Sequence, residues 1–578
     1  MTVLCFLVLF VLLILDLIPG IRNSHELLIN LGAFLPAIIL ASLLLMMVDN
    51  FTYTMFHYGI VSSQGIGRGL YALGYLIVLG YVYWRIKKTL PKISRFLNRN
   101  NFEKTALIIL TGLIIISFLI PICSNDLNIG TGENKTTQAL KKHPHIIIIT
   151  ADGLNAASMS VYGYERDTTP RIRELAETSL VAENAFTNSG STPGSIVSLF
   201  TGKYPATAHV LYPPDILQGE NAYQHLPGIL REQGYYSVQM SIPKFGDAYT
   251  LNFISAFDEA NGRRIEEVIT QLEFIYRYIP SDFAYFLNEI TYRLLDRLKH
   301  IFYLKTMINP YTLVMKPPDK IEDQLKIDHT IELIQKSNQP LMVHIHLMGT
   351  HGPNFNPSIQ TFSKGKDIDT QVSWDADFYD DSILVFDGQI GEIIDELKKQ
   401  GMYENSIIII SSDHGQHWKT YYRIPLIIHF PNGQFKERIK INVQTIDIAP
   451  TILDYLGIKI PGWMQGKSLL ENGLTQRPII GVKSNTEDNV ADNISIKQGS
   501  NFDNYGRISV VYCQKWYLLN LIKFKWESGE VEDHTAPCQA TELITDEEAF
   551  LLMRNHLTEN GFDVSSLDKR YKINKSSR

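Results

Sequence analysis

Two short apolar runs in the sequence each end in an aspartate. Residues 145–150 lead into Asp152, and the similar run at 406–411 leads into Asp413 and His414. Ligands of an open parallel sheet gather beyond the carboxyl ends of its strands, so both aspartates should project from one edge. Two carboxylates and one imidazole suit a divalent Zn²⁺ or Mn²⁺ better than Ca²⁺. Ordinary Asp-Gly turns are the alternative, and the matched placement on twin strands favours the metal site.

The hydroxyl-rich segment at 189–202 offers a nucleophile for such a metal. Thr192 precedes Pro193, which is the form of a helix N-cap followed by proline at the first helical position. A hydroxyl there faces the positive end of the helix dipole, and coordination to a divalent metal makes it a competent nucleophile. A plain helix cap is the simpler interpretation of this segment taken alone.

Alternating strand and helix patterns surround these residues. Four segments have the apolar composition of strands buried in a sheet: 145–150, 341–347, 406–411 and 425–429. Helical patterns at 169–180 and 382–400 alternate with them, which indicates an α/β domain with a mainly parallel central sheet. The aromatic stretch at 255–335 is interpreted as a mostly helical insertion, near the substrate or the membrane surface.

The first 123 residues contain four apolar stretches, which predict a membrane domain of about four transmembrane helices. The stretches are 3–18, 27–48, 70–84 and 105–122. A cleavable signal peptide is the alternative for the first, but it lacks a basic start and a clear cleavage site. Seven lysines and arginines lie between the third and fourth stretches, which places that loop on the cytoplasmic side. We therefore expect a multi-pass protein of the cell (inner) membrane whose catalytic part is extracytoplasmic.

The exported part is divided into a linker at 124–142, a catalytic domain at 143–480 and a C-terminal part at 481–578 that closes the domain. A strand-like segment at 507–512 and an amphipathic segment at 547–557 lie in that last part. Cys513 and Cys538 also lie there, and a disulfide between them is permitted outside the cytoplasm. The net charge of −7, without a basic stripe in the soluble part, argues against nucleic acid as a partner.

Nine motifs follow one another in the order expected of a known superfamily. They are 150–153, 162–170, Thr192 with 201–205, 346–353, 379–387, 412–415, 423–428, 447–457 and 465–469. On these motifs, residues 143–470 resemble the alkaline phosphatase/sulfatase superfamily. The closer likeness is to membrane-bound phosphoethanolamine transferases and lipoteichoic acid synthases.

The resemblance implies four ligands for the catalytic metal: Asp152, Thr192, Asp413 and His414. It also implies that Thr192 takes the phosphoryl group covalently. His346 and His351 resemble the histidines that flank the substrate phosphate, where an imidazole can act as general acid or stabilise phosphoryl oxygens. His344 is expected on the opposite face of the same strand, in a structural role. His417 and Lys419 follow the metal motif, where they would hold a phosphate or lie solvated in a loop.

Three positions differ from the sulfatase pattern that the resemblance brings with it. Sulfatases carry at the place of Thr192 a cysteine or serine that becomes formylglycine, and a threonine cannot be converted in that way. Ile196 replaces an arginine of the sulfatase motif, and Gly153 replaces a second carboxylate. These differences count against sulfate ester hydrolysis. Ser191 stays open as the nucleophile because it adjoins Thr192.

The function that the resemblance implies is a metal-dependent membrane phosphotransferase. Its donor would be a phospholipid with a phosphoethanolamine or phosphoglycerol head group, and its acceptor a glycan, lipid or polymer of the cell envelope. A sulfatase-like or phosphodiesterase-type hydrolase of the same superfamily is the alternative, and the residues do not separate transfer from hydrolysis. A second alternative is an inactive membrane-tethered binding protein, against which the intact set of metal ligands argues.

Overall fold

The structure is a computed structural model of the chain. It describes residues 25–56, 60, 66–98, 143–213, 215–253, 256–264, 294, 320–484, 505–539 and 542–569. Contacts between residues divide the chain into two compact units. The first consists of Met1–Lys135 and Phe283–Asn309, and the second of Thr136–Asp282 and Pro310–Arg578.

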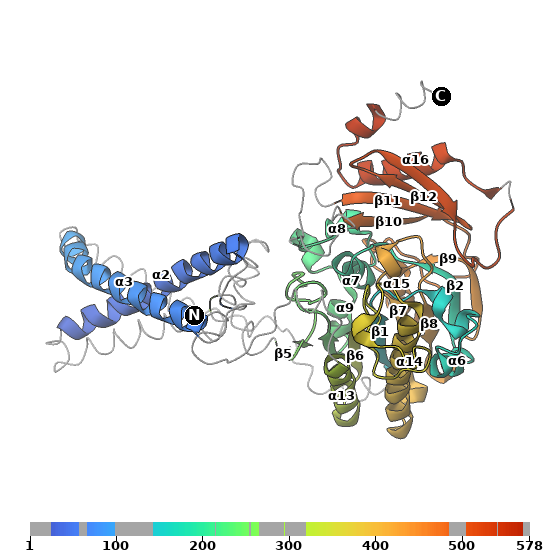
Figure 1. Cartoon of the computed structure of the whole chain (residues 1–578), viewed down its shortest axis with the longest axis horizontal. Helices are drawn as coiled ribbons and strands as arrows, with labels where there is room; N and C mark the ends of the chain where they lie inside the picture. The colour runs from blue at the N-terminus through green and yellow to red at the C-terminus, as the bar shows by residue number, and fades with distance from the viewer. Residues whose placement is uncertain are drawn as a thin grey trace. The chain divides into compact units, whose positions relative to one another are not determined.

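The described part of the first unit is a pair of long helices, drawn in blue in Figure 1. These helices, α2 (His25–Phe56) and α3 (Ile66–Asn98), pack against each other. Among the described residues, one stretch, Gly67–Thr89 in α3, is long and apolar enough to cross a membrane, while Pro36–Asp49 in α2 is apolar but shorter.

This finding bears on the predicted membrane domain of about four helices. The segments predicted at 27–48 and 70–84 fall within α2 and α3, and those at 3–18 and 105–122 lie outside the described residues. The described chain thus contains one candidate span and does not confirm a multi-pass domain.

The second unit is built around a nine-stranded sheet. The strand order is β5-β4-β3-β6-β1-β7-β8-β2-β9. The strands are β1 (His145–Ala151), β2 (Leu180–Phe186), β3 (Tyr236–Met240), β4 (Glu259–Ala260), β5 (Arg263–Arg264), β6 (Leu341–Leu347), β7 (Ser406–Ser412), β8 (Leu426–His429) and β9 (Arg438–Gln444). Neighbours run parallel except where β5 meets β4 and where β8 meets β7 and β2. The prediction of a mainly parallel sheet is confirmed.

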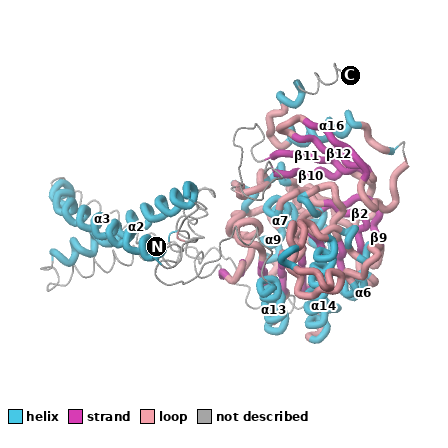
Figure 2. The backbone as a smooth tube through the Cα atoms, viewed as in Figure 1, coloured by secondary structure: helices cyan, strands magenta, loops and turns pink. Residues whose placement is uncertain are grey.

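Helices cover both faces of this sheet (Figures 1 and 2). The helices on one face are α7 (Thr192–Thr201), α9 (Leu226–Glu232) and α15 (Ile448–Tyr455), and those on the other are α6 (Pro170–Ala176), α13 (Lys320–Lys336) and α14 (Ala376–Lys399). Ile146 and Ile148 of β1 pack in the first layer, and Ile147 and Ile149 pack in the second. The unbroken isoleucine runs are explained by this burial on both faces.

Short helical turns link these elements. They are α8 (Pro205–Ala208) and the 3-10 turns Ala156–Ser158, Ser160–Tyr162, Gly219–Ala222, Ile368–Thr370, Tyr403–Asn405, Gln416–Trp418, Pro431–Gly433 and Thr445–Asp447. Of the helical insertion predicted at 255–335, the described residues include helix α13 at its end and the short strands β4 and β5. Most of the remainder lies outside the described residues.

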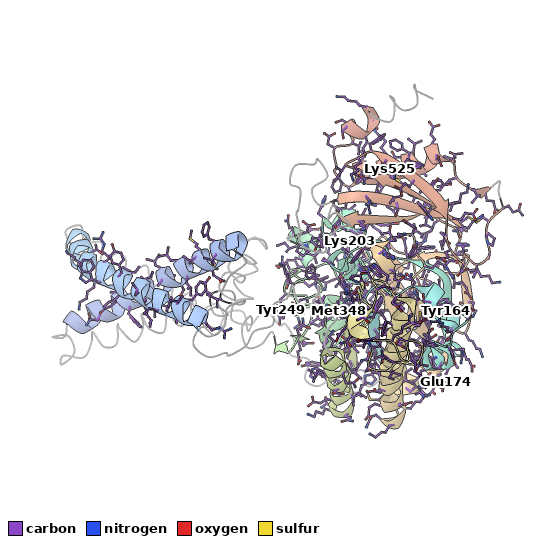
Figure 3. The ribbon with its side chains drawn as sticks, in the orientation of Figure 1. Tyr164, Glu174, Lys203, Tyr249, Met348 and Lys525 are labelled. Carbon is purple, nitrogen blue, oxygen red and sulfur yellow. A yellow bond between two sulfur atoms is a disulfide. The ribbon has the colours of Figure 1, made fainter. Side chains whose placement is uncertain are left out.

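A second, antiparallel sheet follows in the C-terminal part. Its strands are β10 (Ile479–Ser484), β11 (Tyr505–Tyr512), β12 (Lys515–Asn520) and β13 (Lys525–Glu530), and helix α16 (Asp546–Glu559) packs on it. Figure 3 labels Lys525 on this sheet. The predicted segments at 507–512 and 547–557 are confirmed as parts of β11 and α16, while the sheet as a whole was not predicted.

A disulfide joins Cys513 to Cys538, with the two Cα atoms 5.7 Å apart. The segment just before Cys538 is fastened to the nine-stranded sheet by side-chain hydrogen bonds. His534 Nε2 lies 2.9 Å from Asn442 Oδ1, and the amide of Asn184 donates to the carbonyl of Thr535. The disulfide allowed by the sequence is thus present, and it lies close to the hydrogen bonds that join the two sheets.

Candidate active site

The ends of three central strands position the two aspartates of the candidate metal site. Strand β1 lies between β6 and β7 and pairs with both in parallel, with Ala151 opposite Ser412 and Leu347. The backbone N–H of Asp152 donates to the carbonyl of Leu347 at 2.9 Å, and that of Asp413 donates to the carbonyl of Ala151 at 3.1 Å. Both aspartates therefore leave the same edge of the sheet, held by bonds that continue the ladder.

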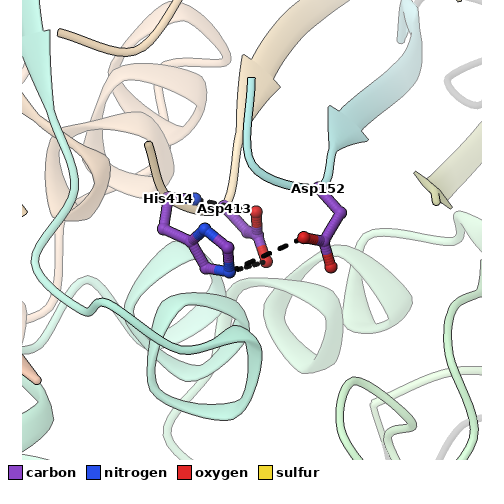
Figure 4. A group of neighbouring side chains, drawn as sticks. All are labelled: Asp152, Asp413 and His414. Atoms are coloured by element: carbon purple, nitrogen blue, oxygen red, sulfur yellow. Dashed lines mark hydrogen bonds and ion pairs between the residues drawn. The ribbon is translucent and has the colours of Figure 1, made fainter. Parts of the chain in front are cut away.

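Asp152, Asp413 and His414 form one buried group, shown in Figure 4. His414 Nε2 lies 3.6 Å from Asp152 Oδ1 and 3.5 Å from Asp413 Oδ2, and one ligand atom from each residue fits within 4.8 Å of the others. His414 Nδ1 lies 3.1 Å from the carbonyl oxygen of Gly415. A proton on Nδ1 donated to that carbonyl leaves the Nε2 lone pair facing the carboxylates, which is the state that binds a metal.

The charges of the two carboxylates also suit a cation. Burial raises the pKa of Asp152, but His351, His346 and His414 outweigh it and hold this pKa below its ordinary value. Burial, and next the charge of Asp152, raise the pKa of Asp413. Among the described residues Asp152 Oδ1 is buried without a hydrogen-bond partner. The donor set of two carboxylates and an imidazole fits Zn²⁺ or Mn²⁺ in kind, without fixing which metal binds.

Thr192 lies against this group at the start of helix α7. Its Oγ1 donates to Asp413 Oδ2 at 2.8 Å. The helix begins at Thr192 and the cap position belongs to Ser191, so the prediction of Thr192 as N-cap is wrong by one residue. Ser191 Oγ donates instead to the carbonyl of Leu211 at 2.6 Å. The hydroxyl that faces the carboxylates is thus that of Thr192, not that of Ser191.

The two histidines predicted to flank the substrate are both brought to this edge. His346 Nε2 lies 3.4 Å from Asp152 Oδ2 and 3.9 Å from Asp413 Oδ2, and its side chain is fully buried. His351 Nε2 lies 4.0 Å from Asp152 Oδ1, and 11% of its side chain is exposed. His351 is therefore the histidine that a substrate entering from solvent would meet first.

The expected placement of His344 on the opposite face of the strand is wrong. Its Nε2 lies 3.1 Å from Thr150 Oγ1, and His346 Nδ1 lies 3.0 Å from the same oxygen. Residues two apart in a strand point to the same face, so His344 and His346 share one face of β6 rather than opposing ones. His344 is fully buried and takes part in the support of His346 through the Thr150 hydroxyl.

His417 and Lys419, predicted to hold a phosphate, have aromatic neighbours. The His417 ring centroid lies 3.9 Å from that of Trp374, and Lys419 Nζ donates to the Tyr422 hydroxyl at 2.9 Å. Their contacts within the described chain do not include the carboxylates of the metal group, so their role stays a prediction.

Two further residues hold the loop after Asp152 and were not predicted as site residues. The Tyr379 hydroxyl donates to the carbonyl of Gly153 and accepts from the N–H of Asn155, both at 3.0 Å. Thr350 Oγ1 donates to the carbonyl of Asp152 at 2.6 Å. Tyr379 lies in the motif at 379–387 and Thr350 in the motif at 346–353. Their place in these motifs was the only sequence signal that could have identified them as site residues.

The sulfatase family model matches residues 144–458 of the chain. An ulvan-active sulfatase of Formosa agariphila is 22% identical over 376 residues, which are 62% of this chain and 69% of that protein. An uncharacterized sulfatase of Escherichia coli is 23% identical over 261 residues, 43% of each protein. An N-acetylglucosamine-6-O-sulfatase of Bacteroides thetaiotaomicron is 36% identical over 110 residues, 16% of this chain and 19% of that enzyme.

Solved structures share the fold. A phosphonate monoester hydrolase from Silicibacter pomeroyi has a TM-score of 0.50 at 16% identity, over 72% of this chain and 95% of that one. A Bacteroides thetaiotaomicron protein of glycosaminoglycan metabolism also has a TM-score of 0.50, at 14% identity over 73% and 98% of the chains. The superfamily prediction is confirmed, while these relatives do not show the closer likeness to phosphoethanolamine transferases and lipoteichoic acid synthases.

Proposed function

The chain belongs to the sulfatase family, and on that premise we propose that it is a metal-dependent ester hydrolase with Thr192 as its nucleophile. The observation that carries the proposal is the 2.8 Å hydrogen bond from Thr192 Oγ1 to Asp413 Oδ2 inside the buried metal-binding group. A divalent cation held by Asp152, Asp413 and His414 would supply Lewis acidity at this point. Such a group at the carboxyl edge of the sheet is where a substrate is expected to bind.

The residues around Thr192 account for a two-step reaction. Thr192 Oγ1 attacks the phosphorus, a Thr192 O–P bond forms, and the bond to the leaving oxygen breaks in line with it. Asp413, whose Oδ2 accepts the hydrogen bond from Thr192 Oγ1, takes up the hydroxyl proton. His351 gives a proton to the leaving oxygen. In the second step water gives a proton to His351 and attacks the phosphorus, the Thr192 O–P bond breaks, and Asp413 returns its proton to Thr192 Oγ1 as the phosphoryl product leaves.

The chemistry at three positions favours a phosphoric or phosphonic ester over a sulfuric ester. Thr192 cannot become the formylglycine of sulfatases, and Ile196 and Gly153 lack the charged groups of the sulfatase pattern. The curated relatives are sulfatases by name, so a sulfuric ester is kept as the second substrate class in the test.

Transfer to an alcohol is a second candidate function, favoured by one observation. The stretch Gly67–Thr89 is long and apolar enough to cross a membrane. A membrane anchor would hold the enzyme near phospholipid head groups, whose phosphoryl group could pass from Thr192 to a glycan, lipid or polymer. We propose this phosphotransferase, in a cell membrane with its catalytic part outside, as the alternative to hydrolysis.

The test is a panel of p-nitrophenyl esters of sulfate, phosphate, a phosphodiester and a phosphonate, with Zn²⁺ or Mn²⁺ added to the full-length protein. We expect turnover of a phosphorus ester, its loss in Thr192→Ala and its retention in Ser191→Ala. Mass spectrometry of a quenched reaction should find the phosphoryl adduct on the peptide that contains Thr192. Turnover of the sulfate ester alone, or full activity of Thr192→Ala, would overturn the proposal.

Hydrolysis and transfer are distinguished by the molecule that receives the phosphoryl group from Thr192. Labelled phosphatidylethanolamine and phosphatidylglycerol, offered with and without a soluble alcohol such as glycerol, should release a free head-group phosphate if water is the acceptor. Label recovered mainly on the alcohol would favour the transferase instead.

A further inference from the structure

The C-terminal sheet reaches the nucleophile loop at strand β10. The backbone N–H of Gly190 donates to the carbonyl of Val482 at 2.8 Å, and the N–H of Val482 donates to the carbonyl of Asn188 at 3.0 Å. A Cβ atom at Gly190 would lie 2.5 Å from the carbonyl oxygen of Trp418 and 3.2 Å from Cγ of Lys483. Trp418 and Lys483 therefore lie directly beside the loop that presents Thr192, two residues after Gly190.

The same tryptophan also borders the loop of His351. The ring centroids of His351 and Trp418 are 6.2 Å apart in an edge-to-face arrangement, and Trp374 lies 5.9 Å from Trp418. A Cβ at Gly352 would fall within 2.1 Å of the Trp374 ring, so this ring packs on the backbone next to His351. Trp374, Trp418 and Lys483 are each half-buried, and together we call them the aromatic rim.

The backbone of the aromatic rim is held in an uncommon conformation. Trp374 and Trp418 have φ values of 64° and 57°, in the left-handed region that bulky residues rarely enter. The N–H of Trp374 donates to the carbonyl of Pro353 at 2.7 Å, and Lys483 Nζ donates to the carbonyl of His417 at 3.4 Å. Such strain persists where the surroundings fix it and is concentrated at ligand-binding sites.

We propose that the aromatic rim is the subsite for the leaving group of the substrate, and that it selects a ring carrying a negative charge. This inference rests on the proposed function, because it takes the reaction to occur at Thr192 and His351. Trp418 offers an indole surface on which a ring can stack. The ammonium of Lys483 lies over that indole, 5.6 Å from its centroid, and would place a positive charge close to a ring bound there.

The selectivity is measured with two esters that share the acid group accepted in the panel above and differ in the leaving group. One releases 4-hydroxybenzoate and the other releases phenol. The ratio of their kcat/KM values in each variant cancels the effect of the variant on the chemistry itself. The ratio is kcat/KM for the 4-hydroxybenzoate ester divided by kcat/KM for the phenol ester. Lys483→Met should lower this ratio by about two- to fivefold, the range of a part-exposed charge pair. Trp418→Ala should raise KM for both esters by about three- to tenfold.

The control is Lys525→Met, which removes a lysine from strand β13 at the other edge of the same sheet, where its side chain is 68% exposed and pairs with Glu527 (Figure 3). It lowers the net charge by the same amount as Lys483→Met and should leave the ratio unchanged. An equal fall of the ratio in both variants would show a long-range effect of charge and overturn the subsite. An unchanged ratio in Lys483→Met would overturn it as well.

A binding measurement separates failure of the subsite from failure of the proposed function. Thr192→Ala protein is titrated with 4-hydroxybenzoate and with phenol in a calorimeter, before and after Lys483→Met is added to it. Tighter binding of 4-hydroxybenzoate that depends on Lys483 supports the subsite even if no ester is turned over. Turnover at Thr192 without this preference, in kinetics and in binding, leaves the hydrolase standing and removes the subsite.

Discussion

The two oxygens of Asp413 have different partners. Oδ1 accepts from the backbone N–H groups of Gly153 and His414, at 3.2 and 2.7 Å. Oδ2 faces the Thr192 hydroxyl and His414 Nε2. One oxygen thus fixes the carboxylate to the strand end, and the other is left for the nucleophile and the cation.

Removal of the carboxylate at Asp152 should weaken metal binding. In Asp152→Asn we expect the affinity for Zn²⁺ or Mn²⁺ to fall by more than about tenfold, since loss of an outer-shell partner alone already costs about 10- to 100-fold. The measurement is metal content by mass spectrometry after dialysis against a graded chelator. Asp395→Asn, at a side chain that is 63% exposed, is the matched control and should keep the metal. Equal metal retention in the two variants would remove Asp152 from the ligand set.

The Thr150 hydroxyl connects two buried histidines of β6. Thr150→Val keeps the shape of the side chain but leaves nitrogens of His344 and His346 without this partner. We expect the free energy of unfolding to fall by about 1–3 kcal/mol, the cost of an unsatisfied buried polar group. Urea denaturation measures this loss, and Thr150→Ser should restore most of it. If the serine variant were as unstable as the valine variant, packing of the methyl group would be the cause instead.

At the scale of elements, helix α14 shows what a cap contributes. The helix pattern at 382–400 predicts only its later part, whereas the structure starts it at Ala376. The Asp375 side chain accepts from the N–H groups of Asp377 and Phe378 and so begins the helix earlier. The added turn carries Tyr379, which bonds the carbonyl of Gly153 next to the metal group.

Loss of this cap should destabilise the fold and loosen the site. Asp375→Ala should lower the free energy of unfolding by about 1 kcal/mol, the usual contribution of a cap. The measurement is chemical denaturation of the full-length protein, with Asp375→Asn as control, which keeps a capping side chain and loses the ion pair with Lys366. An equal loss of stability in the two variants would show that the ion pair, not the cap, stabilises the start of the helix.

Strand β2 was missed although it is buried along its whole length. Its sequence includes Glu183 and Asn184, which interrupt the apolar run by which buried strands are recognised. The Glu183 carboxylate pairs with Arg438, and the Asn184 amide bonds the carbonyls of Lys440 and Thr535. These partners are far away in the sequence, so no local pattern indicates that the two polar side chains have an ion pair and hydrogen bonds inside the fold.

The central strands and the metal group were predictable because each depends on a local pattern. An isoleucine run buried on both faces and an aspartate directly after it are adjacent in the chain, and parallel pairing then brings Asp152 and Asp413 together. The rim around them was not predictable, since Trp374, Trp418 and Lys483 come from three separate segments. Lys483 is brought to Trp418 where the second sheet meets the nucleophile loop, and no spacing in the sequence encodes that contact.

At the scale of the whole molecule, histidines that are half-buried or buried link stability to pH. Burial lowers the pKa of His145, His534 and His556 from 6.5 to about 4. A pKa that is lower in the folded than in the unfolded chain means that the unfolded chain takes up the proton first. The free energy of unfolding therefore falls as the pH drops below 6.5 and stops falling from this source near pH 4. Asp387, whose pKa burial raises to about 6, acts in the opposite sense between pH 6 and 4.

His556 isolates one of these contributions, because it is buried in α16 with its ring against Tyr204 at 4.8 Å. His556→Phe keeps an aromatic ring there and removes the titration. Between pH 7.5 and pH 5, wild type should lose about 2 kcal/mol more of its free energy of unfolding than the variant, since one pKa unit corresponds to about 1.4 kcal/mol. Urea titrations at the two pH values give this loss for each protein separately. A difference in stability between the two proteins at pH 7.5 therefore does not affect the comparison. Parallel losses in the two proteins would mean that His556 is protonated in the folded state as easily as in the unfolded chain.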